Sequence, residues 1–168
     1  MRADAQENHD RVLRVAAQAF ERDGTGTSLK AIAREAGVGI GTVYRRFPTR
    51  EALVEAVYRQ EVDRLCASAS SGTLRAWMER FVDFMATKRG LGETLRAALT
   101  SPEEKQQTRD QLRSAIASLL ASDPSVRPGI DPNDLLMSLG GITLIAAEER
   151  QRELASRLLD LLTEGLQE

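Results

Sequence analysis

The chain has little of what most enzyme sites, secreted proteins and membrane proteins require. It contains one cysteine, Cys66, and one histidine, His9. A single cysteine cannot form an internal disulfide, which favours a reducing, cytoplasmic environment. We expect Cys66 to be a small, half-buried hydrophobic residue rather than a redox sensor, and His9 to be solvated in a frayed N-terminal stretch. No uninterrupted apolar run approaches the roughly 18 residues of a transmembrane helix, so we expect no membrane partner.

The sequence patterns of common catalytic sites are absent as well. There is no Cys/His metal cluster, no glycine-rich phosphate loop and no nucleophile elbow. Carboxylates such as Glu148 and Glu149 are explained as solvated helix surface. We therefore expect no enzymatic activity, no cofactor and no metal.

Strand-forming residues are also sparse, with aromatic residues at 4% of the chain, whereas apolar residues recur at spacings of three and four. The pattern predicts an all-α fold with about nine helices. The predicted helices cover approximately 6–22, 29–36, 40–47, 50–67, 74–88 and 91–99, two that begin at 102 and 132, and 151–166.

Several helix ends have recognisable signals. Ser28 and Thr49 are predicted N-caps, and Gly24 suits a left-handed C-cap. Proline follows a capping residue at Ser101-Pro102 and Asp131-Pro132, which predicts a helix start at each. The break between the last two helices has no glycine or proline to mark it.

Charge and linker composition divide the chain into a head and a body. Residues 1–60 carry ten Lys and Arg against eight Asp and Glu (+2), and residues 61–168 carry thirteen against seventeen (−4). The stretch 68–72, Ser-Ala-Ser-Ser-Gly, looks like a linker. We expect a DNA-binding domain at 1–50, a connecting helix at 50–67 and a helical body at 68–168.

Residues 25–50 have the layout of a helix-turn-helix. Two short helices are joined by a glycine turn and followed by three arginines within six residues. At 100° per residue, Val43 and Phe47 fall within about 40° of each other and should face the core. Gly41, Thr42 and Arg45 then lie on the opposite face, where a recognition helix meets the major groove.

Each exposed residue suggests a role at DNA. Arg45 is the best candidate for reading a base, because guanidinium can bridge guanine O6 and N7. Thr42 could touch a thymine methyl or a phosphate, and glycines at 39 and 41 would allow close approach. Residues better suited to holding phosphates are Thr27, Ser28, Tyr44, Arg46 and Arg50.

Residues 10–60 resemble the DNA-binding head of the tetracycline-repressor (TetR) family of bacterial regulators. The resemblance is carried by Ala16-Ala17-Gln18-Ala19-Phe20, Asp23-Gly24, Thr27-Ser28-Leu29, Ile32-Ala33, Glu35-Ala36-Gly37-Val38, Gly41-Thr42-Val43-Tyr44 and Phe47-Pro48-Thr49-Arg50-Glu51-Ala52-Leu53. By the family pattern, DNA contacts fall on Thr27, Ser28, Gly39, Ile40, Gly41, Thr42, Tyr44, Arg45, Arg46 and Arg50. Arg50 stands where family members often have lysine, and arginine keeps the charge.

The resemblance implies a homodimeric repressor that binds a pseudo-palindromic operator in double-stranded DNA and is released by a small-molecule effector. It places dimer contacts on the last two helices, where we expect Leu139, Gly140, Ile142, Leu154, Leu158, Leu161 and Leu162. The predicted effector pocket comprises Trp77, Phe81, Phe84, Met85, Leu95 and Leu99, although for any single one of them plain core packing is favoured over contact with a ligand. The alternative is a partner-controlled or architectural DNA-binding protein without a small ligand, and a ligand-sized cavity would argue against it.

Overall fold

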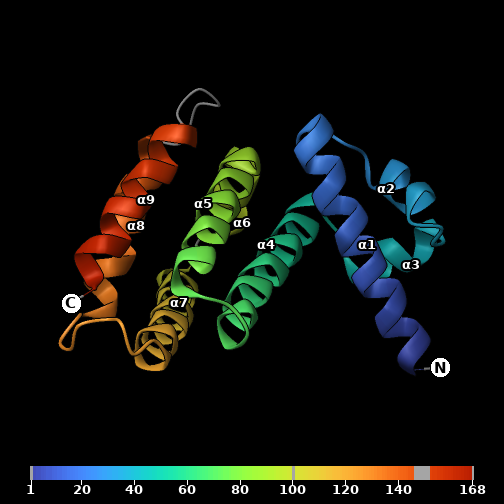
Figure 1. The fold of residues 1–168 in the computed structure, drawn as a ribbon. Coiled ribbons are helices and arrows are strands. Elements are labelled where there is room, and N and C mark those ends of the chain that lie inside the picture. Colours follow the sequence, from blue (N-terminus) through green and yellow to red (C-terminus); the bar gives the residue numbers. More distant parts are fainter. Residues whose placement is uncertain (1, 100, 146–151, 168) are drawn as a thin grey trace. The chain divides into compact units, whose positions relative to one another are not determined.

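The protein is an all-α chain in the computed structural model, which describes residues 2–99, 101–145 and 152–167 (Figure 1). Within these ranges the only β feature is an isolated antiparallel bridge between Val126 and Gln167. The nine predicted helices are confirmed. In chain order they are α1 (Arg2–Asp23), α2 (Leu29–Glu35), α3 (Ile40–Arg46), α4 (Arg50–Ala67), α5 (Leu74–Gly90), α6 (Gly92–Ala98), α7 (Pro102–Ser122), α8 (Pro132–Ile145) and α9 (Arg152–Leu166). A short 3-10 helix, η1 (Ser68–Ser70), lies between α4 and α5 in the predicted linker.

The predicted helix ends follow their local signals. Ser28 caps α2 by accepting the amide of Ala31 at 3.1 Å. Thr49 caps α4 in the same way, through the amide of Ala52 at 3.1 Å. Gly24 closes α1 with a φ of 75°, a conformation that residues with a Cβ rarely adopt. Short-range capping chemistry therefore sets where these elements begin and end.

The N-terminal part of α1 differs from expectation. The helix begins at Arg2, several residues before the predicted start, and His9 is half-buried rather than solvated. Its ring stacks on Phe47, with 5.4 Å between ring centroids and 24° between planes. This tertiary contact orders a stretch that its polar composition suggested would fray. The predicted break between the last two helices lies outside the described residues.

The chain forms two compact units. The first comprises Met1–Glu61 with Thr87–Ser101, and the second comprises Val62–Ala86 with Pro102–Glu168. Residues 87–101 therefore group with the N-terminal helices, whereas the sequence-based division places them in the body. Inside the first unit, the Lys88 ammonium lies 5.4 Å from the centre of the Tyr58 ring, and Thr94 donates to Thr25 at 3.1 Å.

The second unit is built around the buried faces of α5, α7, α8 and α9. Trp77, Met78, Ile116, Leu119, Leu139 and Leu159 are each at most 2% exposed. Arg75 joins α5 to α9, because its guanidinium lies 2.8 Å from the Asp160 carboxylate and donates to Ser156 Oγ at 3.1 Å. Helices α8 and α9 lie side by side (Figure 1).

Candidate nucleic-acid interface

Helix α3 is held against α1 and α2 by its inner face. Val43 is 1% exposed and Phe47 is 5% exposed, as the helical period predicts. The preceding turn is closed by Gly37, which has a φ of 64°, and by a bond from the Val38 amide to the Ala33 carbonyl at 3.0 Å. The left-handed backbone at Gly37 sets the angle at which α3 leaves α2.

The outer face of α3 carries most of the predicted contact residues. Tyr44 is 50% exposed and Ile40 is 38% exposed, both high for large apolar side chains. Exposed residues also include Gly39, Gly41, Arg45, Arg46 and Arg50, whereas Thr42 is half-buried. The inner and outer faces of this helix therefore agree with the prediction. A role in binding DNA for each residue remains a prediction.

Three arginines at or just beyond the end of α3 have no carboxylate partner in the described part of the chain. Arg45, Arg46 and Arg50 form no ion pair there, while arginines elsewhere in the same unit, such as Arg22 and Arg59, do. Unpaired guanidinium groups on one small surface favour binding of an anion from outside, because each can bind a phosphate or a base edge without losing an internal partner.

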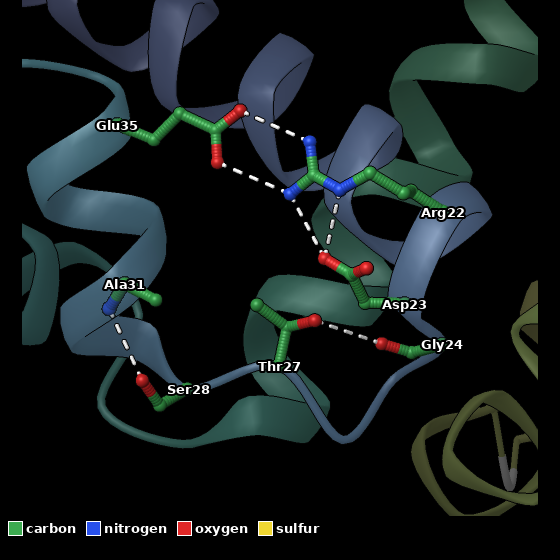
Figure 2. A network of polar contacts seen from close by, with 7 residues as sticks. All are labelled: Arg22, Asp23, Gly24, Thr27, Ser28, Ala31 and Glu35. Atoms are coloured by element: carbon green, nitrogen blue, oxygen red, sulfur yellow. Dashed lines mark hydrogen bonds and ion pairs between the residues drawn. The ribbon is translucent and has the colours of Figure 1, made fainter.

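The hydroxyl groups at the start of α2 are not equivalent (Figure 2). Ser28 Oγ accepts the Ala31 amide, which leaves its own hydrogen available to a phosphate. Thr27 Oγ1 donates its hydrogen to the Gly24 carbonyl at 3.1 Å and is half-buried. Ser28 is therefore the better phosphate donor of the two, since Thr27 must first give up an internal bond.

An exposed ionic cluster holds the end of α2 to the end of α1 (Figure 2). Arg22 Nε donates to Asp23 at 2.9 Å, and its two terminal nitrogens each lie 3.4 Å from an oxygen of Glu35. Hydrogen bonds to Asp23 and Glu35 raise the pKa of Arg22 above its ordinary value. Exposed pairs contribute little to stability. Here the cluster helps to orient α2, which leads into α3.

The glycines at 39 and 41 are not required by the chain's own packing. A Cβ at Gly41 would meet nothing within 4 Å, and one at Gly39 would meet only Thr42 Oγ1, at 4.0 Å. Neither has a positive φ. Both positions are therefore open to an external surface, and the absence of side chains would let DNA approach the start of α3 closely.

The residues predicted for an effector pocket pack mainly as core. Trp77, Phe81 and Phe84 are at most 8% exposed, and neighbouring rings lie 5.8 Å and 6.3 Å apart. These three and Met85 belong to the second unit, whereas Leu95 and Leu99 belong to the first. The six predicted pocket residues are therefore divided between the two units. The ring contacts favour core packing, rather than ligand binding, for Trp77, Phe81 and Phe84.

The second unit contains an open groove of about 1050 Å³. It is lined by Cys66, Ala69, Ser70, Pro102, Glu103, Gln106, Gln107, Asp110, Gln111, Ser114, Ala115 and Ser118. Sequence reasoning missed it, because the polar face of α7 reads as ordinary solvated surface. Cys66 is half-buried, and burial raises the pKa of its thiol. In the described residues, no three His, Cys, Asp or Glu side chains group in a way that could hold a metal.

The residues predicted for a dimer interface divide by exposure. Leu161 is 63% exposed and Leu154 is 36% exposed, whereas Gly140, Ile142, Leu158 and Leu162 are half-buried. Leu139 is fully buried within the chain and offers no surface for a dimer contact. Met137 and Leu144, at 67% and 76% exposed, were not anticipated. Met137, Leu144, Leu154 and Leu161 lie on α8 and α9, the two helices on which the sequence predicts the dimer contacts.

A glycine turn between two short helices, the second with an exposed basic face, defines a DNA-binding protein of the helix-turn-helix class. Residues 12–57 match the model for bacterial regulatory proteins of the TetR family, and residues 69–168 match the model for the C-terminal domain of SbtR-like transcriptional regulators. The chain belongs to the TetR family of transcriptional regulators. Within the described residues, no helix has the length and apolar character needed to span a bilayer.

Solved structures agree over nearly the whole chain. The TetR transcriptional regulator SCO0520 from Streptomyces coelicolor is 41% identical with a TM-score of 0.81, and the match covers 94% of this chain and 97% of that one. A TetR regulatory protein from Mycobacterium vanbaalenii is 29% identical with a TM-score of 0.76, and the match covers 99% of both chains.

Curated relatives match over a shorter region. An HTH-type transcriptional regulator of Staphylococcus aureus is 38% identical over 64 residues. That match covers 38% of this chain and 35% of the relative. The chain thus matches about a third of the length of these curated relatives.

Proposed function

We propose that this transcriptional regulator is a homodimeric repressor that binds a pseudo-palindromic operator and leaves it when a small molecule binds the body. The observation that carries the proposal is the outer face of α3, where Arg45 and Arg46 are exposed without an ion-pair partner in the described chain. Arg45 would read a base in the major groove, while Arg46, Arg50 and Ser28 would hold phosphates. Such a repressor works in the cytoplasm, where bacterial DNA lies.

Dimerisation is supported by the apolar surface of α8 and α9. Met137, Leu144 and Leu161 are each more than 60% exposed, and in a single protomer they face water. A Cβ at Gly140 or Gly141 would meet nothing within 4 Å, so the protomer's own packing does not account for glycine inside α8. A partner helix that packs closely on this face would account for both features. A twofold dimer would place two α3 helices roughly 34–36 Å apart on successive major grooves.

Leu161→Glu is expected to weaken the dimer about 100-fold or more. The substitution places a charge in an apolar contact. In a twofold dimer both subunits carry the substitution, so the loss of binding free energy occurs at two places in the interface. Mass in solution, measured over a dilution series, gives the dissociation constant. Ala121→Glu, at an exposed site on α7, is the matched control and should dimerise as the wild type does. If the Leu161→Glu protein remained dimeric at the same dilution, the proposal that α8 and α9 form the dimer interface would be refuted.

Control by a ligand is supported by the groove of about 1050 Å³, which is large enough for a drug-sized molecule. Its lining includes Cys66 at the end of α4 together with η1 and the polar face of α7. Helix α4 contributes residues to both units, so a ligand that shifts its end could alter the head. Only a few kcal/mol of differential affinity between two states is needed for release. The walls are mostly apolar, with a few amide, hydroxyl and carboxylate groups among them, which suits a ligand that has an apolar body and some hydrogen-bonding groups.

The proposed function is tested by selecting bound fragments from genomic DNA with the full chain. We expect the enriched fragments to share a pseudo-palindrome that is bound at least about 1000-fold more tightly than random DNA at physiological salt. Compounds acted on by the products of neighbouring genes are then screened for release of the labelled operator. Binding that does not discriminate among sequences would refute the repressor proposal, and an operator that no compound releases would favour control by a partner protein.

A further inference from the structure

His9 lies at the end of the recognition helix although it belongs to α1. Its imidazole stacks on Phe47, the residue that ends α3, with 5.4 Å between centroids. Its Nδ1 is inaccessible to water and has no hydrogen-bond partner among the described residues. A buried ring nitrogen without a partner disfavours the charged ring, because both nitrogens of that form carry a hydrogen that needs an acceptor.

The same ring forms one wall of a small cavity whose other wall is α3. The cavity has a volume of about 320 Å³ and is lined from α1 by residues that include Asn8, His9 and Val12. From α3 it is lined by Thr42, Arg45 and Arg46. Two of the three arginines assigned to DNA thus share a cavity with His9, and the space leaves them room to move if the ring is removed.

Charge in the cavity favours the neutral form of the ring. Burial and the nearby Arg46 guanidinium lower the pKa of His9, and Asp10 opposes them. The charged groups that line the cavity are Asp4 from α1 and Arg45 and Arg46 from α3. A neutral ring packs beside Arg46 without repelling it, which keeps the end of α3 compact.

We propose that His9 is a positioning residue for DNA recognition, whose stacking on Phe47 holds the end of α3 and thereby the direction of Arg46. The inference rests on the proposed function, because it takes Arg46 as a phosphate contact. His9 itself is given no contact with DNA.

His9→Ala is expected to weaken operator binding about tenfold and to lower the slope of log affinity against log salt by about one, as for one lost phosphate contact. His9→Phe keeps an aromatic ring on Phe47 and should retain the wild-type slope and affinity within about threefold. Glu7→Ala, at an exposed site on the same helix, is the matched control. The measurement is a titration of the operator by each full-length variant at four or more salt concentrations.

The salt slope separates positioning from simple destabilisation. A smaller folded fraction lowers the apparent affinity by the same factor at every salt concentration and leaves the slope unchanged. A His9→Ala slope equal to that of the wild type would therefore overturn the proposal. In an Arg46→Ala background, adding His9→Ala should change affinity less than about twofold, and a full tenfold loss there would also overturn it.

If His9→Ala does not fold, the comparison moves to His9→Leu, which fills the space without an aromatic face. A wild-type slope in folded His9→Leu would again refute positioning by the stack. Wild-type protein that fails to discriminate the operator refutes the proposed function. If the wild type binds the operator and His9→Ala binds it with the same affinity and salt slope, only the inference about His9 is refuted and the proposed function stands.

Discussion

Trp77→Ala is expected to lower the free energy of unfolding by about 3–5 kcal/mol. Trp77 is fully buried and stacks on Phe81, with 5.8 Å between ring centroids. Its indole N–H donates to the Leu65 carbonyl at 2.9 Å, which ties α5 to the last turns of α4. The substitution removes the ring, the hydrogen bond and the packing around both. Because Trp77 is the chain's single tryptophan, unfolding by denaturant should be followed by far-ultraviolet circular dichroism rather than fluorescence.

Two further variants separate the contributions of Trp77. Trp77→Phe keeps an aromatic ring but removes the N–H, and should be less damaging, with a loss of about 1–3 kcal/mol. Glu79→Ala, on the exposed side of α5, should change stability by less than about 1 kcal/mol because it removes only a surface ion pair with Arg75. If Trp77→Ala lowered the free energy of unfolding by less than about 1 kcal/mol, a major contribution of this side chain to the core would be refuted.

Arg45→Ala is expected to weaken operator binding about 10- to 100-fold and to relax the base preference at one position in each half-site, as for loss of a bidentate base contact. Arg45 is exposed on α3 and has no ion-pair partner among the described residues, so its removal should leave the fold intact. Binding titrations on the operator and on its single-base variants give the two readouts. Circular dichroism checks the fold.

Matched variants decide whether Arg45 reads a base or merely adds charge. Arg46→Ala should weaken binding by a similar factor on every sequence and reduce the salt slope by about one. Arg34→Ala, an exposed arginine at the end of α2, should leave affinity within about twofold. Tyr44→Ala should also reduce affinity. Unchanged binding by both Arg45→Ala and Tyr44→Ala would refute the assignment of this face.

Local sequence signals predicted local structure well. Ser28, Thr49 and Gly24 mark helix ends because each forms bonds, or adopts a φ, within a few residues of itself. Periodicity likewise predicted that Val43 and Phe47 face inward, since a helix repeats its faces every three to four residues. Such features need no knowledge of what lies across the core.

Predictions that depended on distant neighbours fared less well. His9 was expected in water, yet it packs on Phe47, which lies 38 residues later. One signal was available, because His9 precedes the buried pair Val12 and Leu13 by one helical turn and falls on the same stripe. Leu139 was placed in the dimer interface with its leucine neighbours, although its side chain is fully buried within the protomer. The spacing of apolar residues along a helix does not show which side chains pack inside the same chain and which are left exposed for a second chain.

By itself the sequence determined the all-α class, the helix ends and the composition of the recognition helix, because these depend on periodicity, capping and residue type within one or two turns. Only the tertiary structure decided that the ring of His9 stacks on Phe47 at the end of α3, and that α7 and the end of α4 line one groove. It also decided that the side chains of Met137, Leu144 and Leu161 are exposed in the single chain. Each of these depends on how separate helices pack, which is set by side-chain shape and contact across the core.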